Sequence, residues 1–369
     1  MLVQELKPES KATVSPRIIG FGECLPGEPV TNEQMEQLLS IRKEWLETMI
    51  GNRSRHFAVN FSSRTIDYGL ADLCTEAAVE AIDDAGINAE ELDLIVLSTA
   101  TPDHLMPATV NIVADRLGLE RVKTYQIQAG CSGALQALDV ARHMLVGSHR
   151  YALVIGGDVC NKYMDLSRDF SKLRSSELIN YALFGDGAGA VVLTNENQDG
   201  LQISYIENRF EGKGRAPGQI MNWFGTVPEN VQELSKRELR KQFQSAKEDY
   251  KAIEQHVPIM TEQAIEELLG QMKWTKEEVS YYLPPQLGWN MTKKIIDLLG
   301  LPLDSTINCV QETGNNGNAL PYLQLKRLNG ILKPNDKVVG VAIESSKWMK
   351  TGITLEYKKG EALDGTRDS

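Results

Sequence analysis

Two stretches of this chain repeat the same order of short elements, and this repeat constrains the fold more than any single motif. Each copy has a Leu-Gly-Leu sequence, a strand, a turn rich in small residues, a helix and a closing strand rich in Val and Ile. The copies begin at Leu117 and Leu299 and close with strands at residues 151–156 and 337–343. A duplicated strand-helix unit predicts two similar halves, with a site where the loops at the strand ends meet.

Short apolar runs alternate with helix-length amphipathic segments, which is typical of an α/β protein with buried strands. Strands are predicted at 94–97, 151–155, 189–193, 337–343 and near 306–310, and helices at 70–85 and 261–272. We expect one half in residues 1–195 and the other in residues 196–369. The charged segment 207–255, with a helix expected over 233–250, is predicted to be an insertion or cap over the core.

Cys131 lies where an alternating strand pattern changes abruptly into a helical one, within residues 124–138. Gly130 and Gly133 permit a tight turn and leave room for a substrate carbonyl. The partial positive charge of a helix N-terminus favours a thiolate over a thiol, and the backbone N–H groups there can hold an oxyanion. This pattern predicts a cysteine that carries an acyl group, with a buried structural cysteine as the alternative.

Composition narrows the partners and the compartment. A net charge of −11 argues against nucleic acid or an anionic membrane as the main partner. The five cysteines are scattered, without the spacing of a metal site or a disulfide framework, which fits a reducing cytosol. The N-terminus has no signal-peptide pattern, and no apolar run is long enough for a membrane span. We expect a cytoplasmic protein without a metal.

Several motifs together make the chain resemble the β-ketoacyl-acyl-carrier-protein synthase III branch of the thiolase-fold condensing enzymes, over nearly its whole length. The motifs are residues 44–56, 101–107, 129–133 and 183–190 and the pair Gly314-Asn315. The resemblance implies a thiolase fold, in which two similar βαβ-type halves form a layered α-β-α-β-α arrangement. It also implies that Cys131 is acylated by a thioester, and that Asn315 donates a hydrogen bond to a thioester carbonyl. Asn316 and Asn318 are alternatives for that second role.

The resemblance further implies the substrates and the partner. The acyl donor is a coenzyme A thioester or an acyl-phosphopantetheine carrier protein, and no other cofactor is expected. Trp45 matches a residue that stacks on adenine, and Gly133 lines the substrate site. The family is dimeric, so a homodimer is expected in which Met106 contributes to the neighbour's acyl pocket. Asp186 is expected to brace a loop near the site rather than to bind a nucleotide.

Two positions depart from the family pattern at the site itself. Counting back from Leu299 without gaps, Pro285 occupies the position of the catalytic His, and proline has no ring nitrogen to donate a hydrogen bond or move a proton. None of the five histidines replaces it obviously. Glu344 stands in a loop where the family has glycines. It is a candidate general base if desolvated, and the alternative is that it points away and pairs with a cation such as Lys347.

A third departure concerns the donor. Met49 replaces the Arg that follows the stacking Trp by four residues, so half of the clamp on coenzyme A is missing and a carrier-protein donor becomes more plausible. Four cations are candidates for a phosphopantetheine phosphate or an acidic carrier surface, with solvated surface charge as the alternative: Arg53, Arg55, Lys293 and Lys294.

Two functions stay open from the sequence. The first is an acyltransferase in which Cys131 takes an acyl group and passes it to a carbon or heteroatom nucleophile, in specialised polyketide or fatty-acid-derived metabolism. Loss of the His is expected to weaken malonyl decarboxylation most. The second is a non-catalytic or half-catalytic subunit of a heteromeric condensing enzyme. The intact cysteine turn favours the first function, and Pro285 favours the second.

Overall fold

The computed structural model describes residues 15–63, 65–163, 169–173, 175–221 and 246–360, and nine strands in these ranges form one mixed sheet. The strands are β1 Arg17–Cys24, β6 Leu94–Thr99, β7 Lys123–Gln128, β8 Tyr151–Asp158, β9 Gly187–Thr194, β10 Gly200–Phe210, β13 Tyr281–Leu283, β14 Lys337–Glu344 and β15 Met349–Lys358. Their order is β13-β14-β15-β10-β1-β9-β8-β6-β7. The strands predicted at 94–97, 151–155, 189–193 and 337–343 are confirmed, and each is somewhat longer than expected.

The order of strands repeats between the two ends of this sheet. In the first half, β6 runs parallel to β7 and β8, and β9 joins β8 to β1 in antiparallel fashion. In the second half, β13 runs parallel to β14, and β15 joins β14 to β10 in antiparallel fashion. The halves meet where β1 pairs with β10. We propose the domain boundary at residue 195, in the connection between β9 and β10.

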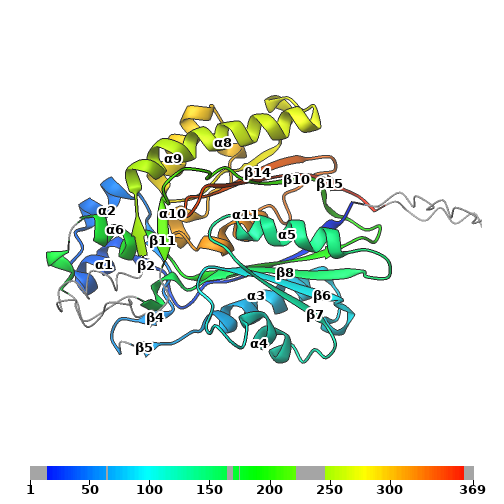
Figure 1. Ribbon diagram of the computed structural model, residues 1–369, viewed down its shortest axis with the longest axis horizontal. Helices are drawn as coiled ribbons and strands as arrows, with labels where there is room; N and C mark the ends of the chain where they lie inside the picture. The colour runs from blue at the N-terminus through cyan, green and yellow to red at the C-terminus, as the bar shows by residue number, and fades with distance from the viewer. Residues whose placement is uncertain (1–14, 64, 164–168, 174, 222–245, 361–369) are drawn as a thin grey trace, which may run out of the picture.

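The strands of the two halves lie in two stacked layers, which are joined where β1 pairs with β10. Helices lie outside each strand layer and between the two, so that five layers stack as α-β-α-β-α (Figure 1). The helices are α3 Leu70–Ala85, α4 Thr109–Arg116, α5 Gly133–Met144, α8 Tyr250–Met272, α9 Trp289–Leu299 and α11 Leu320–Lys326. Helix α3 covers β1 and β9, α8 covers β14 and β15, and α5 and α11 fill the middle layer. The arrangement predicted for the layers is therefore observed.

Smaller elements surround the end of the sheets at which the parallel strands finish. They are α1 Asn32–Leu39, α2 Lys43–Met49, α6 Ser175–Leu183, α10 Val310–Thr313, and the strands β2 Val30–Thr31, β3 Ser54–Arg55, β4 Val59–Asn60, β5 Thr65–Ile66, β11 Gln219–Met221 and β12 Ala246–Glu248. The small helices α1, α2 and α6 gather on one side of the molecule (Figure 1).

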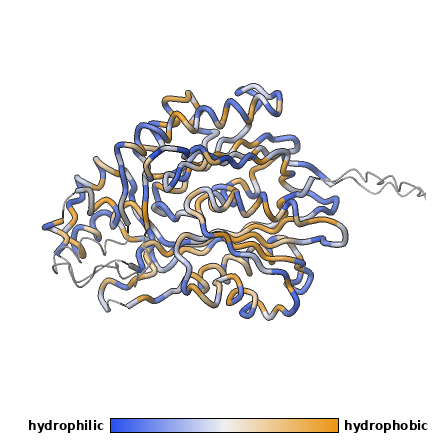
Figure 2. Tube along the Cα trace, viewed as in Figure 1, coloured by the Kyte–Doolittle hydropathy of each residue, from blue (hydrophilic) through white to orange (hydrophobic). Residues whose placement is uncertain are grey.

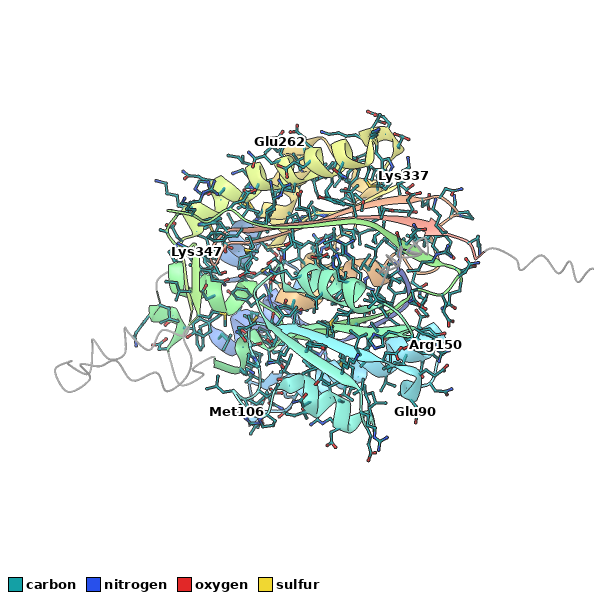
Figure 3. All side chains as sticks on the ribbon, turned by 45° about the vertical axis from the view of Figure 1, so that its right-hand side comes forward. Glu90, Met106, Arg150, Glu262, Lys337 and Lys347 are labelled. Atoms are coloured by element: carbon teal, nitrogen blue, oxygen red, sulfur yellow. The ribbon has the colours of Figure 1, made fainter. Side chains whose placement is uncertain are left out.

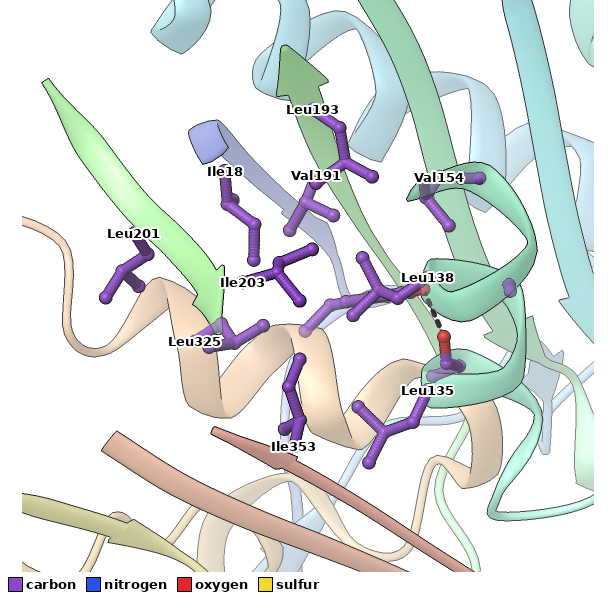
Figure 4. Packing of buried hydrophobic residues seen from close by; sticks show 14 of the residues in the cluster. Ile18, Leu135, Leu138, Val154, Val191, Leu193, Leu201, Ile203, Leu325 and Ile353 are labelled. Carbon is purple, nitrogen blue, oxygen red and sulfur yellow. Dashed lines mark hydrogen bonds between the residues drawn. The ribbon is translucent and has the colours of Figure 1, made fainter. Parts of the chain in front are cut away.

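The main core lies around the middle layer. Figure 2 shows apolar segments concentrated along the central strands, and Figure 4 shows side chains from α5, α11 and strands of both halves packed together. Leu135, Leu138, Ile203 and Ile353 are among the fully or nearly fully buried residues there. Burial of this apolar surface holds the helix that follows Cys131 against both halves.

Three sequence predictions fail in the second half. The strand expected near residues 306–310 is only an isolated bridge between Thr306 and Tyr282, because α10 begins at Val310 and leaves no length for a strand. The helix expected over 233–250 is wrong at its end, where Ala246–Glu248 pairs with Gln219–Met221 as a strand. The cap predicted over 207–255 begins too early, because residues 207–210 are the end of β10 and pair with β15 in the main sheet. Residues 222–245 of the predicted cap lie outside the described residues.

Candidate active site

Cys131 lies in the turn that joins β7 to α5, as the sequence predicts. Strand β7 ends at Gln128 and α5 begins at Gly133, whose N–H donates to the Gly130 carbonyl over 2.8 Å. The N–H of Ala129 donates to the Thr99 carbonyl at the end of β6 over 3.2 Å. The cysteine is therefore held at the carboxyl ends of the parallel strands, where α/β proteins place their ligand sites.

A buried hydrogen-bond network fixes this turn from below. The Asn318 amide donates to the Ala129 carbonyl over 2.9 Å and to Asp158 Oδ2 over 2.8 Å. Asp158 Oδ2 also accepts from the Asn318 N–H, and Asp158 Oδ1 accepts from three further donors: Thr99 Oγ1, Ala100 N and Thr101 Oγ1. A Cβ on Gly133 would stand 2.2 Å from Asn318 Oδ1, so only glycine fits this packing. Asn318 therefore braces the turn from the second half of the chain.

Glu344, at the end of β14, points at the cysteine turn. Its Oε2 accepts from the Gly130 N–H over 3.0 Å and from Ser132 Oγ over 2.6 Å, and its Oε1 accepts from Ser346 Oγ. Lys347 instead donates to the Arg215 carbonyl, so the alternative in which Glu344 pairs with Lys347 is wrong. Both carboxylate oxygens are hydrogen-bonded by the turn and its own loop, which suits a positioning role.

The thiol of Cys131 is held in its neutral form. Burial is the largest cause that raises its pKa, to about 12, and the charges of Glu344, Asp158 and Glu248 raise it further. A backbone hydrogen bond lowers the pKa but does not outweigh these effects. The prediction of a thiolate at the helix N-terminus is therefore wrong for the resting site, because desolvation and three carboxylates outweigh the helix dipole. Attack by this sulfur needs a base.

Three asparagines follow Gly314, which has a φ of +74° that favours glycine. The Asn316 amide donates to the carbonyls of Asp186 and Thr313, over 2.9 and 3.2 Å. A substrate contact by Asn316 would have to replace one of these bonds. Asn315 is buried, and its Oδ1 accepts from the Gly317 N–H over 3.0 Å. That bond fixes the orientation of the side chain and does not use its NH₂ group.

Asp186 connects the loops that contain Ala58 and Asn161, which confirms its predicted role as a loop-bracing residue. One carboxylate oxygen accepts from the Ala58 N–H over 2.8 Å, and the other accepts from the backbone and side-chain amides of Asn161, over 3.0 and 3.1 Å. Arg55 packs nearby against Gly314 and is fully buried. Its guanidinium donates to the Ala182 carbonyl and to Asn32 Oδ1, so the idea that Arg55 meets a carrier phosphate is wrong.

Pro285 is buried two residues beyond β13, at the position that the sequence count gives to the catalytic His. The neighbouring Gln286 accepts from the N–H groups of Cys309 and Val310, both over 2.8 Å, and so fixes the start of α10. All five histidines lie in described residues and are used or exposed elsewhere: His56 at the carbonyls of Pro26 and Gly27, His143 and His149 at those of Asp139 and Met144, His256 against the Trp348 ring, and His104 at the surface.

The expected substrate-binding residues of the periphery differ in exposure. Trp45, on α2, is half-buried against an apolar cluster, and Met49 at the end of the same helix is exposed. Met106 is 87% exposed and lies at the edge of the molecule (Figure 3). Lys293 and Lys294 are engaged in ion pairs, with Asp297 and Glu254 respectively.

Sequence reasoning missed two carboxylates that act on Cys131. Asp158 is the last residue of the buried strand β8. An aspartate that ends an apolar strand after two glycines is a sequence signal for a buried carboxylate at a site. Glu248 comes from the charged segment that was read as a cap, and nothing in its sequence context separates it from surface glutamates. In the described ranges no helix is long and apolar enough to cross a membrane, and no group of three or more His, Cys, Asp or Glu forms a metal site.

Comparison with known proteins places this site in a family. A family model described as 3-oxoacyl-[acyl-carrier-protein] synthase III matches residues 125–211. A β-ketoacyl-[acyl-carrier-protein] synthase III from Clostridium perfringens (strain SM101 / Type A) is 30% identical over 330 residues, which cover 88% of this chain and 94% of that protein. A protein of the same description from Rhizorhabdus wittichii is 30% identical over 325 residues, covering 87% and 93%.

Solved structures agree. A structure described as "AbyA1 - tetronic acid condensing enzyme" has 44% identity and a TM-score of 0.86, covering 93% of this chain and 100% of that one. A 3-oxoacyl-[acyl-carrier-protein] synthase III from Aquifex aeolicus VF5 has 26% identity and a TM-score of 0.75, with the same coverage. The five layers described above are thus those of the thiolase fold.

Proposed function

Since this chain belongs to the β-ketoacyl-[acyl-carrier-protein] synthase III family, we propose that Cys131 accepts an acyl group from a carrier-protein or coenzyme A thioester and passes it to a carbon or oxygen nucleophile. The observation that carries this proposal is the fully assembled cysteine turn. Asn318, which Asp158 holds in place, bonds to the Ala129 carbonyl, and Glu344 accepts a hydrogen bond from the Gly130 N–H. A turn without catalytic use would not need a buried network shared between both halves of the chain.

The nucleophile follows from Pro285 and from the relative named above. Because the ring nitrogen of proline carries no hydrogen and is not basic, the site lacks the group that supports malonyl decarboxylation in the family. A carbon between two carbonyls of a β-ketoacyl thioester is acidic enough to act as a nucleophile with no decarboxylation. We therefore propose a condensation that builds a tetronic acid-type ring. Its carbon–carbon bond forms at the acyl-enzyme, and its ester bond forms when a hydroxyl of the acyl group displaces the second thioester.

The remaining residues have separate roles in this proposal. Asn315 donates its amide hydrogen to a thioester carbonyl, and backbone N–H groups of the cysteine turn hold the oxyanion. Glu344 keeps that turn in place through Gly130 and Ser132, as a positioning residue. Gly133 leaves the space at the start of α5, and the half-buried Trp45 stacks on the adenine when the donor is a coenzyme A thioester.

We propose that two copies of the chain form the active species. Strand β7 ends the sheet on one side and pairs only with β6 among the described strands, which leaves its outer edge open. Leu105 and Met106 are exposed, and Met106 fits the role of a residue given to the neighbour's acyl pocket. We expect the mass of a dimer in sedimentation equilibrium at micromolar concentration. A monomer under those conditions contradicts this proposal.

The alternative is a non-catalytic or half-catalytic subunit of a heteromeric condensing enzyme, and Pro285 is the observation in its favour. Purified protein given a β-ketoacyl thioester and a 2-hydroxyacyl thioester distinguishes the two. We expect mass spectrometry to show that the thiol of each substrate thioester is released and that a new lactone forms. We expect a malonyl thioester to be decarboxylated at or near the uncatalysed rate. No product, with no acyl adduct from any donor, refutes the enzyme and supports the subunit.

A further inference from the structure

The hairpin of β11 and β12 carries Glu248 and packs beside the loop that follows Glu344. The Gly218 N–H donates to the Ser345 carbonyl over 2.9 Å, and Trp348 Nε1 donates to the Ala216 carbonyl over 2.7 Å. These bonds dock the start of the hairpin on the loop that follows Glu344. Gln219 on β11 is the register partner of Glu248 on β12. Glu248 is therefore carried by a hairpin that is anchored to the loop next to Glu344.

The carboxylate of Glu248 is buried and only half satisfied. Its Oε1 accepts from Gln219 Nε2 over 2.7 Å, while its Oε2 is fully buried and has no hydrogen-bond partner among the described residues. An unpaired buried carboxylate oxygen is costly, so a native site that keeps one needs a reason. Burial raises the pKa of Glu248 to about 7, and the Gln219 hydrogen bond acts in the opposite direction.

Glu248 is close enough to Cys131 for its charge to raise the pKa of the thiol. The site needs a base, because that pKa is about 12 and the amide nitrogen of Pro285 is not basic. Glu344 is the other carboxylate at the turn, but both of its oxygens already accept hydrogen bonds from Gly130, Ser132 and Ser346. Among the described groups that act on the thiol, Glu248 has the vacant acceptor.

We propose that Glu248 is the general base that takes the proton of Cys131, directly or through one water, as the sulfur attacks the acyl thioester. The S–H bond of Cys131 breaks and its proton goes to Oε2 of Glu248, while a new bond joins the sulfur to the acyl carbon. The bond from that carbon to the donor sulfur then breaks, and the leaving thiolate takes the proton back from Glu248. The carboxylate is restored and no oxidant or reductant is needed.

The inference rests on the proposed acylation of Cys131, and rates of acylation separate the two. With the best donor from a panel of acyl-coenzyme A thioesters, intact mass gives the rate of adduct formation against pH. We expect the wild-type rate to rise with pH through about 7, as Glu248 loses its proton. Tyr250, the titratable neighbour at the start of α8, stays neutral in this range because burial and Glu248 raise its pKa.

Glu248→Gln is expected to form the same adduct at a rate lower by about 10²- to 10⁴-fold, without the rise near neutral pH. Glu262→Gln, on the exposed face of α8, is the matched control and is expected to keep the wild-type profile (Figure 3). A wild-type rate and profile in Glu248→Gln overturns the inference and leaves the proposed function standing. Absence of any adduct in the wild type overturns the proposed function itself.

A second variant guards against misfolding of the first. Gln219→Leu removes the hydrogen bond that lowers the pKa of Glu248, so the rise in rate is expected to move to higher pH. Above the shifted midpoint, the rate is expected to reach the wild-type maximum. A role that is only structural predicts a lower rate at every pH and no such shift. An unchanged midpoint in a folded Gln219→Leu protein contradicts the proposal.

Discussion

Cys131→Ala is expected to abolish both the acyl adduct and turnover, with a fall in rate of about 10⁴-fold or more. The other hydroxyl or thiol in the turn between β7 and α5, Ser132 Oγ, is bonded to Glu344 and Gln136. The hydrogen bonds that hold this turn run through its backbone and through Ser132 rather than through the cysteine sulfur. The fold should therefore survive the change. Intact mass after incubation with acyl thioesters measures the adduct, and a thiol-release assay measures turnover.

Cys24→Ser is the matched control for this variant. Cys24 is also a partly exposed free cysteine, but its sulfur donates to Glu76, and burial and that carboxylate raise its pKa well above the ordinary range. It lies at the end of β1, away from the cysteine turn in the chain. We expect adduct and turnover to be kept. An adduct that persists in Cys131→Ala and disappears in Cys24→Ser refutes the assignment of the nucleophile.

Asp158→Ala is expected to lower the free energy of unfolding by about 3–5 kcal/mol, the largest stability effect that we predict. The change removes an acceptor from five donor groups, of which the Asn318 side-chain amide keeps its bond to the Ala129 carbonyl: Thr99 Oγ1, Ala100 N, Thr101 Oγ1, and the backbone and side-chain amides of Asn318. These donors belong to both halves of the chain, so their loss also loosens the cysteine turn. Urea unfolding followed by circular dichroism measures the difference.

Asp297→Ala is the control for that measurement. Asp297 is exposed on α9 and pairs with Lys293 within the same helix, so its removal should change the free energy of unfolding by less than about 0.5 kcal/mol. Asp158→Asn keeps one carbonyl oxygen and is expected to lose less than Asp158→Ala. Equal stability of Asp158→Ala and Asp297→Ala contradicts the role given to the network.

Local patterns in the chain were sufficient to predict most of the scaffold. Helix α3 was predicted with its observed limits, because its apolar positions repeat at helical spacing and Gly86, with a φ of +66°, ends it. The turn at Cys131 was also predicted, since alternation stops there and helical spacing begins at once. The strand predicted near residues 306–310 was wrong, because a single backbone bridge leaves almost the same apolar pattern as a short strand.

The chemistry of the site was less accessible from the sequence. The helix N-terminus beside Cys131 predicted a thiolate, but a thiol pKa depends on every charge nearby and on burial. Glu344 comes from a strand that follows the cysteine by more than two hundred residues, and Glu248 comes from a charged segment in which every glutamate looks alike. Their distance in sequence hides the fact that both carboxylates act on one sulfur.

The sequence by itself determined the place of Cys131 at a strand-to-helix turn, the duplicated α/β architecture and the absence of a histidine at Pro285, because each depends on residue types and their local spacing. Only the tertiary structure decided the raised pKa of Cys131, the hydrogen bonds of Glu344 to the cysteine turn and the vacant acceptor on Glu248. The reason is physical: burial and charge act through space, and the fold brings β7, β8, β14 and the β11–β12 hairpin to a single point.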